Sequence, residues 1–108
     1  MRKVAIVTGA TRGIGKAAAL ELAKCGFAVA VTGRTRHEGE GRLTSWGAPE
    51  AIIVPGSIDA TVREIEAAGG EALGVPLDIL DRASIDAAVD AVLAQWGRID
   101  GLFNNAIY

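Results

Sequence analysis

A glycine-rich turn between a short apolar run and a helix-like run constrains the fold of this chain more than any other feature. The apolar run covers residues 4–7, and the turn, with the spacing G-x-x-x-G-x-G, covers residues 8–15. Gly9 permits a sharp turn off a strand, Gly13 lets the backbone approach a pyrophosphate, and Gly15 lets the helix lie close to the sheet. A pyrophosphate would meet the free N–H groups and the positive dipole end of that helix. The layout predicts a dinucleotide-phosphate site, and the alternative is a strand–turn–helix whose glycines serve packing alone.

The composition suits one small packed domain. Half of the 108 residues are hydrophobic, which is enough for a core. The formal net charge is -2, which argues against nucleic-acid and anionic-membrane partners. Residues 4–7 are too few for a signal-peptide core, and no apolar stretch approaches the length of a transmembrane helix. We therefore expect a soluble cytoplasmic protein.

The chain has one cysteine and one histidine, Cys25 and His37. A single cysteine excludes an internal disulfide and a cysteine metal cluster, and a single histidine leaves no metal constellation, so no metal site is expected. Cys25 lies at helical spacing from Ile14, Ala18 and Leu22, which predicts one apolar helix face. On that face Cys25 would be buried filler and not a reactive thiol.

Strand-like and helix-like segments alternate along the rest of the chain. The strand-like segments are short and apolar, as in buried parallel strands. Ser57 and Asp81 are predicted helix N-caps, and glycines follow each predicted helix. The expected strands are 3–7, 27–32, 72–77 and 101–104, and the expected helices run over 14–25, from Ser57 to Gly69-Gly70, and from Asp81 to Gly97.

Strands joined through helices form a parallel sheet, so an α/β fold is expected. Right-handed crossovers place the first two helices on one face of the sheet. With the strand order 3-2-1-4, which the sequence alone does not fix, the third helix covers the other face. Open α/β sheets bind ligands where the strand order reverses, at the carboxyl ends of the strands. The glycine turn and Asn104-Asn105 would meet there.

Residues 33–56 form an unusually long connection, and such connections are often functional. Residues 51–54 are apolar enough to dock on the domain or to form an extra short strand, and the sequence does not decide between the two. Trp46 is expected to anchor the connection by packing.

Four motifs follow one another along the chain. They are TGxxxGxG at 8–15, LDIxD at 77–81, GRID at 97–100 and NNA at 104–106. In this order and at this spacing they resemble the short-chain dehydrogenase/reductase family, and the resemblance covers the whole chain. It implies a Rossmann-type fold, a parallel sheet of about four strands flanked by helices, and a nicotinamide dinucleotide as cofactor and partner. The sequence departs from the family pattern at Ile107, where a glycine is usual.

The resemblance also implies which residues contact the cofactor. Asp78 has an alternative role, because it could merely cap the third helix together with Asp81. Asn104 is better explained as an amide that satisfies the backbone at the strand end. The implied contacts are Gly9, Arg12, Gly13, Ile14 and Gly15 for the pyrophosphate, Asp78 and Ile79 for the adenine, and Asn105 and Ala106 for the ribose.

The end of the second predicted strand bears on the choice between NADP and NAD. A site that prefers NAD usually has an acidic residue there to bind the 2′-hydroxyl, but the chain has Thr32 and Gly33. Arg34 follows directly, and Arg12 lies inside the glycine turn. Two guanidinium groups could bind a 2′-phosphate through paired hydrogen bonds. We favour NADP over NAD on these grounds, and the alternative is that both arginines are merely solvated.

The family's catalytic pair is a tyrosine with a lysine four positions later, supported by a serine, all beyond the fourth strand. The lysine lowers the pKa of a phenol that exchanges a proton with the carbinol oxygen. The 108 residues contain no Tyr-x-x-x-Lys, and the one tyrosine is the last residue, Tyr108. No catalytic residue is therefore assigned.

The preferred hypothesis is that residues 1–108 are the cofactor-binding part of an NADP-dependent oxidoreductase acting on alcohol and carbonyl groups. This domain is truncated after its fourth strand and is expected to be inactive alone. The alternative is a non-catalytic dinucleotide-binding module or redox sensor, and a methyltransferase is disfavoured because residues 32–33 are not acidic. An open edge on the fourth strand predicts association or poor solubility. The resemblance implies a homo-oligomeric parent whose contacts lie mostly outside these residues.

Overall fold

A four-stranded parallel sheet lies between two layers of helix. The structure is a computed structural model and describes residues 2–34, 42–43, 52–53 and 56–106. The sheet order is β5-β2-β1-β6, and all three strand pairs are parallel. The elements are β1 (Val4–Val7), α1 (Gly13–Lys24), β2 (Ala28–Gly33), β3 (Arg42–Leu43), β4 (Ile52–Ile53), α2 (Ile58–Ala67), β5 (Glu71–Pro76), α3 (Arg82–Trp96) and β6 (Gly101–Phe103).

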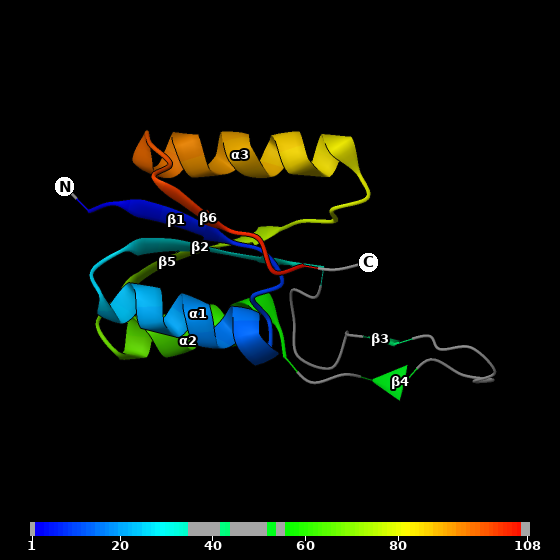
Figure 1. The fold of residues 1–108 in the computed structure, drawn as a ribbon, viewed down its shortest axis with the longest axis horizontal. Helices are drawn as coiled ribbons and strands as arrows, with labels where there is room; N and C mark the ends of the chain where they lie inside the picture. Colours follow the sequence, from blue (N-terminus) through cyan, green and yellow to red (C-terminus); the bar gives the residue numbers. More distant parts are fainter. Residues whose placement is uncertain (1, 35–41, 44–51, 54–55, 107–108) are drawn as a thin grey trace.

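The sheet confirms the predicted strand order 3-2-1-4, because β5 is the third long strand and β6 the fourth. Helices α1 and α2 lie on one face of the sheet, and α3 lies on the other (Figure 1). This arrangement follows from right-handed crossovers that turn outward in both directions from β1. The reversal of strand order therefore falls between β1 and β6.

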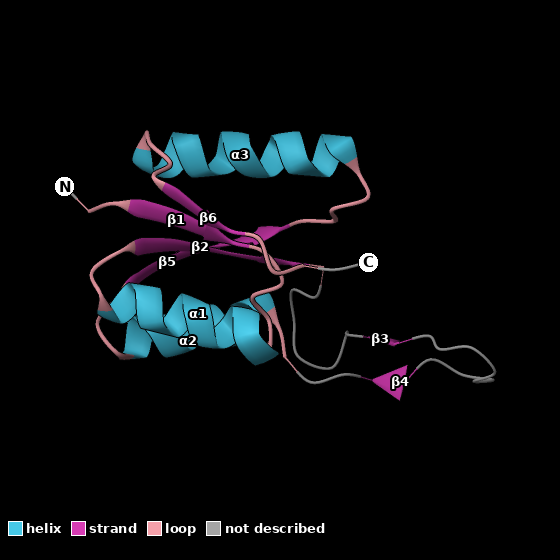
Figure 2. Cartoon of the chain, viewed as in Figure 1, coloured by secondary structure: helices cyan, strands magenta, loops and turns pink. Residues whose placement is uncertain are grey.

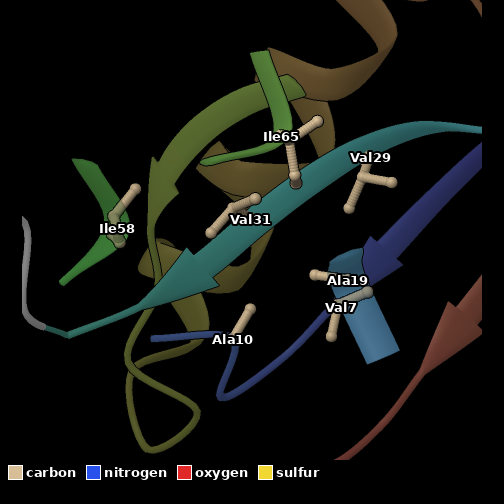
Figure 3. Close-up of a cluster of buried hydrophobic side chains, with 7 residues drawn as sticks. All are labelled: Val7, Ala10, Ala19, Val29, Val31, Ile58 and Ile65. Atoms are coloured by element: carbon tan, nitrogen blue, oxygen red, sulfur yellow. The ribbon is translucent and has the colours of Figure 1, made fainter. Parts of the chain in front are cut away.

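Both faces of the central strands are buried. All residues of β1 and β2 are buried, which explains why these strands are apolar without alternation. The cluster shown in Figure 3 lies between the sheet and helices α1 and α2: Val7, Ala10, Ala19, Val29, Val31, Ile58 and Ile65. On the face toward α3, Val4, Ile6, Ala28 and Ala30 of the sheet cluster with Val92 and Trp96 of the helix.

Helix α1 turns a different face to the sheet from the one predicted. Cys25 is exposed and Ile14 is 72% exposed, so the prediction of a buried face containing both residues was wrong. The buried residues of α1 are Gly15 and Ala19, and Leu22 packs against the same cluster. Small residues face inward because they let the helix axis approach closely, which Ile14 in that position would prevent.

The predicted caps of α2 and α3 are confirmed. The Ser57 hydroxyl accepts a hydrogen bond from the N–H of Ala60 at 3.0 Å. The Asp81 carboxylate accepts one from the N–H of Ala83, also at 3.0 Å. Gly97 ends α3 in a left-handed conformation with φ of 73°, where glycine carries no steric cost. Local sequence signals therefore set the bounds of both helices.

The connection between β2 and α2 contains a second, two-stranded sheet. Strand β4 (Ile52–Ile53) lies within the apolar run 51–54 and pairs antiparallel with β3 (Arg42–Leu43). Figure 2 shows this pair apart from the main sheet, on the side of its carboxyl ends. The extra short strand, one of the two open possibilities, is therefore the one observed. Trp46 lies outside the described residues, as do Ile107 and Tyr108.

Strand β6 leaves apolar side chains exposed on both faces of the sheet. Leu102 pairs with Ile6 and Phe103 with Val7, so the two β6 side chains point to opposite faces. Leu102 is 63% exposed and Phe103 39%. Beside β6 on the α1 side is a hollow of about 390 Å³, lined by Lys3, Ala5, Leu22, Phe27, Asp100, Gly101, Leu102 and Phe103.

That hollow is lined by none of the predicted cofactor residues. The exposed strand agrees with the predicted open edge, and the association expected from it stays a prediction. Within the described residues, no helix is both long and apolar enough to cross a membrane.

Candidate functional site

The candidate site lies at the carboxyl ends of β1 and β6, the two strands that flank the reversal of strand order. The glycine turn follows β1, and residues 104–106 follow β6. Open α/β sheets bind ligands at this position because the loops of neighbouring strands separate there. The sequence predicted that these two segments would meet, and the structure brings them into contact.

Thr8 holds the two segments together. Its buried hydroxyl accepts hydrogen bonds from the N–H of Asn105 at 2.8 Å and from the N–H of Ala106 at 3.0 Å. The hydroxyl donates to Asn104 Oδ1, with 3.2 Å between the two oxygens, and the Thr8 N–H donates to the Phe103 carbonyl at 3.0 Å. Sequence reasoning missed this role of Thr8. The only signal was a hydroxyl residue placed directly before the first glycine of the turn.

Gly9 and Gly15 pack against each other. A Cβ on Gly15 would lie 2.0 Å from the Gly9 carbonyl oxygen and 2.8 Å from Nδ2 of Asn105. The Asn105 amide also donates to the Gly9 carbonyl at 3.5 Å. Gly15 is therefore required by the turn it follows, and this contact lets α1 begin directly beside residues 105–106.

Gly13 differs from Gly15 because its surroundings are open. An added Cβ would meet no protein atom within 4 Å, but φ is 59°, a conformation that side chains other than glycine rarely adopt. Position 13 therefore requires glycine for its backbone angle, and no atom of the described residues fills the space beside it. This is the geometry expected of a glycine that lets a ligand approach the backbone.

Within the described residues, no side chain caps the backbone donors at the N-terminus of α1. The N-cap, Arg12, is extended and makes no side-chain capping bond, and the first turn holds no acidic residue. The first N–H groups of a helix have no acceptor within it. Together with the helix dipole they favour an anion at this position. Ile14, in this first turn, is exposed beside them.

Ala10, between the glycines, is fixed through both of its backbone groups. Its N–H donates to the Thr32 carbonyl at 2.9 Å, and its carbonyl accepts from the Thr61 hydroxyl at 2.9 Å. The Thr32 hydroxyl in turn donates to the Val7 carbonyl at 2.8 Å. Because all of these groups are buried, the turn is held by β2 and α2 and not only by its own glycines.

Arg12 and Arg34 both lie at this edge of the sheet and are exposed. Thr11 directly precedes Arg12, and Gly33 directly precedes Arg34. Thr11 and Gly33 lie in contact, since a Cβ on Gly33 would lie 2.7 Å from Cγ2 of Thr11. The two arginines therefore leave the backbone from neighbouring points on the glycine turn and the end of β2. Neither guanidinium group has a hydrogen bond or ion pair within the described residues.

Asp78 and Ile79 follow β5, which pairs with β2 at the same edge. The Asp78 carboxylate accepts from the N–H of Leu80 at 3.0 Å, and the Asp78 N–H donates to the Ser84 hydroxyl at 2.9 Å. Asp78 thus shapes the turn that leads into α3, while the N-cap of that helix is Asp81. Among the described residues, the Asp78 carboxylate makes no capping bond to α3. Ile79 packs against the cluster that contains Leu77. The adenine contact stays a prediction for both residues.

Asp100 aligns the start of β6 with β1. Its carboxylate receives hydrogen bonds from the Arg98 guanidinium at 2.6 and 2.8 Å and from the Val4 N–H at 2.7 Å. The Arg98 hydrogen bond, followed by the Val4 N–H, lowers the pKa of Asp100 below its ordinary value. The same pair raises the pKa of Arg98. The GRID motif therefore fixes the register of β6, the strand that Asn105 follows.

Asp100→Asn is expected to lower the thermal unfolding midpoint at neutral pH. Because folding lowers the pKa of Asp100, the ionised carboxylate stabilises the fold fully above its unfolded pKa, about 4. This stabilisation is lost as the pH falls through the folded pKa. The difference between wild type and variant should therefore shrink below about pH 4 in circular-dichroism melts. Asp90→Asn, an exposed change on α3, is the control, and a difference independent of pH would contradict this account.

The family comparison agrees with this geometry. The short chain dehydrogenase family matches residues 3–61 and 51–107. Cyclohexanol dehydrogenase of Rhodococcus sp. (strain TK6) is 41% identical over 104 residues, 96% of this chain and 36% of that protein. Hydroxysteroid dehydrogenase-like protein 2 of Homo sapiens is 39% identical over 100 residues, 93% of this chain and 21% of that protein. The chain thus spans at most 36% of the length of these two relatives.

Solved structures show the same fold with bound cofactor. A metagenomic short-chain oxidoreductase in complex with NADP matches with a TM-score of 0.75 at 39% identity, over 98% of this chain and 39% of that one. An actinorhodin polyketide ketoreductase variant with NADPH matches with a TM-score of 0.76 at 34% identity, over 99% of this chain and 34% of that one. The chain belongs to the short chain dehydrogenase family of oxidoreductases.

Proposed function

We propose that these residues form the cofactor-binding part of an NADP-dependent oxidoreductase that acts on alcohol and carbonyl groups. The observation that carries the proposal is the N-terminus of α1, which has no side-chain cap and no acid in its first turn. It lies beside a glycine turn that Thr8 ties to residues 105–106. A nicotinamide dinucleotide supplies hydride transfer when bound, and the chain's own residues supply its binding and orientation.

The donor set and the open backbone suit a dinucleotide pyrophosphate. The N–H groups of the first turn of α1 would bind the phosphate oxygens, and Gly13 offers a backbone with no Cβ in the way. Asn105 and Ala106, held at the other side of the turn, would contact the nicotinamide-side ribose. Asp78 and Ile79 would flank the adenine at the opposite end of the same edge.

Two arginines support NADP over NAD. Arg12 and Arg34 leave the backbone beside the contact between Gly33 and Thr11, and the end of β2 has no acidic residue that would repel a 2′-phosphate. Guanidinium groups bind phosphate through paired, charge-assisted hydrogen bonds. The solved relatives that were crystallised with NADP and with NADPH agree with this choice.

We further propose that these residues do not transfer hydride by themselves. Reduction of a carbonyl requires an acid that protonates the developing alkoxide. The family's Tyr-x-x-x-Lys is not among the 108 residues, and the one tyrosine, Tyr108, lies outside the described residues. The substrate class rests on the family and on the names of the relatives, one of which is a cyclohexanol dehydrogenase.

Arg34→Ala tests the cofactor choice. Loss of a charge-assisted contact to the 2′-phosphate is worth about 1.5–3 kcal/mol, so the Kd for NADP⁺ should rise by roughly 10- to 150-fold while the Kd for NAD⁺ changes little. Isothermal titration of both dinucleotides measures the two constants. Arg63→Ala, which removes an exposed arginine from α2, is the matched control. Equal losses for NADP⁺ and NAD⁺ in Arg34→Ala would remove the 2′-phosphate role.

A further inference from the structure

Both ends of the connection between β2 and α2 pack against one residue of the glycine turn, Thr11. At the first end, a Cβ on Gly33 would lie 2.7 Å from Cγ2 of Thr11. At the second end, a Cβ on Gly56 would lie 2.2 Å from the Thr11 carbonyl oxygen and 3.1 Å from Cβ of Arg12. Gly56 also has φ of 103°, which favours glycine on backbone grounds alone. The backbone before α2 is therefore packed against the backbone of Thr11–Arg12.

Helix α2 contacts the same turn a second time. Its N-cap, Ser57, is fully buried, and one helical turn later the buried Thr61 hydroxyl donates to the Ala10 carbonyl at 2.9 Å. Gly56 and Thr61 thus contact three successive residues, Ala10 to Arg12. The start of α2 therefore fixes the position of this part of the glycine turn.

The direction in which the Arg12 side chain leaves the backbone depends on these contacts with α2. It is the N-cap of α1, its backbone is extended, and its side chain makes no capping bond. Within the described residues the guanidinium has no partner that would orient it. The direction in which Arg12 leaves the turn is therefore set by its backbone, and that backbone lies between Gly56 and the first turn of α1.

We propose that Gly56 and Thr61 are positioning residues that set cofactor preference, because they fix the point from which Arg12 reaches the 2′-phosphate of NADP. Neither residue needs to contact the dinucleotide, since both act through the backbone of the glycine turn. This inference rests on the proposed function. It adds that α2 contributes to the preference for NADP over NAD. Without this support Arg12 would be displaced, while the N–H groups at the start of α1 would remain.

Gly56→Ala tests the proposal directly. The new Cβ must displace the Thr11 carbonyl, because a backbone atom 2.2 Å away cannot be avoided by a side-chain rotation. The Kd for NADP⁺ is expected to rise about tenfold, equivalent to about 1.4 kcal/mol, and the Kd for NAD⁺ less than about threefold. Both constants are measured by isothermal titration on the whole 108-residue chain, with a thermal melt of each variant.

Gly26→Ala is the matched control. Gly26 has a similar φ of 95°, but a Cβ there meets no atom within 4 Å. This variant carries the same kind of backbone strain without the contact to Thr11. It should lower the melting temperature while leaving the ratio of the two Kd values unchanged. A merely structural role for Gly56 would give the same ratio in both variants.

Thr61 provides a second test, which also decides the matter if Gly56→Ala does not fold. Thr61→Val removes the hydroxyl that holds the Ala10 carbonyl at nearly constant side-chain volume, and Thr61→Ser retains it. The expected result is a lower NADP⁺-to-NAD⁺ preference in Thr61→Val and recovery of the preference in Thr61→Ser. An unchanged ratio in Thr61→Val would overturn the proposal.

Failure of the proposed function and failure of the positioning role give different results. If the wild-type chain binds neither dinucleotide, the proposed function fails, and the positioning role fails with it. If the wild-type chain prefers NADP⁺ but Gly56→Ala and Gly26→Ala keep the same preference, the proposed function stands and the positioning role is wrong.

Discussion

Gly15→Ala is expected to abolish dinucleotide binding at ordinary titration concentrations and to destabilise the fold by about 2 kcal/mol. Alanine is favoured over glycine in a helix by about 1 kcal/mol, but here its Cβ would lie 2.0 Å from the Gly9 carbonyl and 2.8 Å from the Asn105 amide. Overpacking of this kind costs about 1–3 kcal/mol and moves the backbone. The Kd for NADP⁺ should rise at least about a hundredfold, because α1, the turn and Asn105 are all displaced.

Gly101→Ala is the matched control for that variant. Gly101 also lacks a left-handed backbone, and a Cβ there meets no atom within 4 Å. Titration with NADPH, followed by its fluorescence, and a thermal melt compare the two variants. Binding by Gly15→Ala within about threefold of wild type would mean that the close contact between helix and turn does not support the cofactor site.

Thr8→Val is the second change with a large expected effect. Valine has the shape of threonine but leaves the N–H groups of Asn105 and Ala106 without their acceptor. Each unsatisfied, partly buried group costs about 1–3 kcal/mol, so a loss of about 3 kcal/mol in unfolding free energy is expected. The segment after β6 should separate from the glycine turn, and affinity for both dinucleotides should fall together.

Thr8→Ser keeps the hydroxyl and removes only a methyl group, so it should retain both stability and affinity within about 1 kcal/mol. Urea unfolding gives the free energies, and titration with NADP⁺ and NAD⁺ gives the affinities. If valine and serine at position 8 behave alike, the hydroxyl does not couple the two segments, and the geometry of the site must be maintained by other contacts.

The fold was predictable because its signals are local or follow from handedness. Ser57 and Asp81 cap their helices as expected, since an N-cap acts within three residues of itself. Right-handed crossovers place α1 and α2 on one face, and the side taken by α3 follows once the strand order, which the sequence alone does not fix, is known. The face that α1 turns to the sheet was not predictable from apolar spacing. The close contact at Gly15 places small residues against the sheet and leaves Ile14 exposed.

The candidate site was predictable only in its glycines and in the segment it faces. A left-handed turn or a close backbone contact restricts a position to glycine, so such positions leave a visible pattern. Thr8, Gly56 and Thr61 left no comparable signal. The Thr61 hydroxyl meets a carbonyl 51 residues earlier in the chain, and a hydroxyl in a helix is ordinary until the fold shows which carbonyl it reaches.

Titration of the 108-residue chain with NADPH, in parallel with Gly15→Ala, tests the central claim most directly. The α1 N-terminus and the glycine turn are expected to bind a nicotinamide dinucleotide without the residues that would transfer its hydride. The predicted result is saturable binding by wild type, none by Gly15→Ala, and no NADPH oxidation with carbonyl compounds by either. Absence of binding by folded wild-type chain, or steady NADPH oxidation by it, would contradict the account.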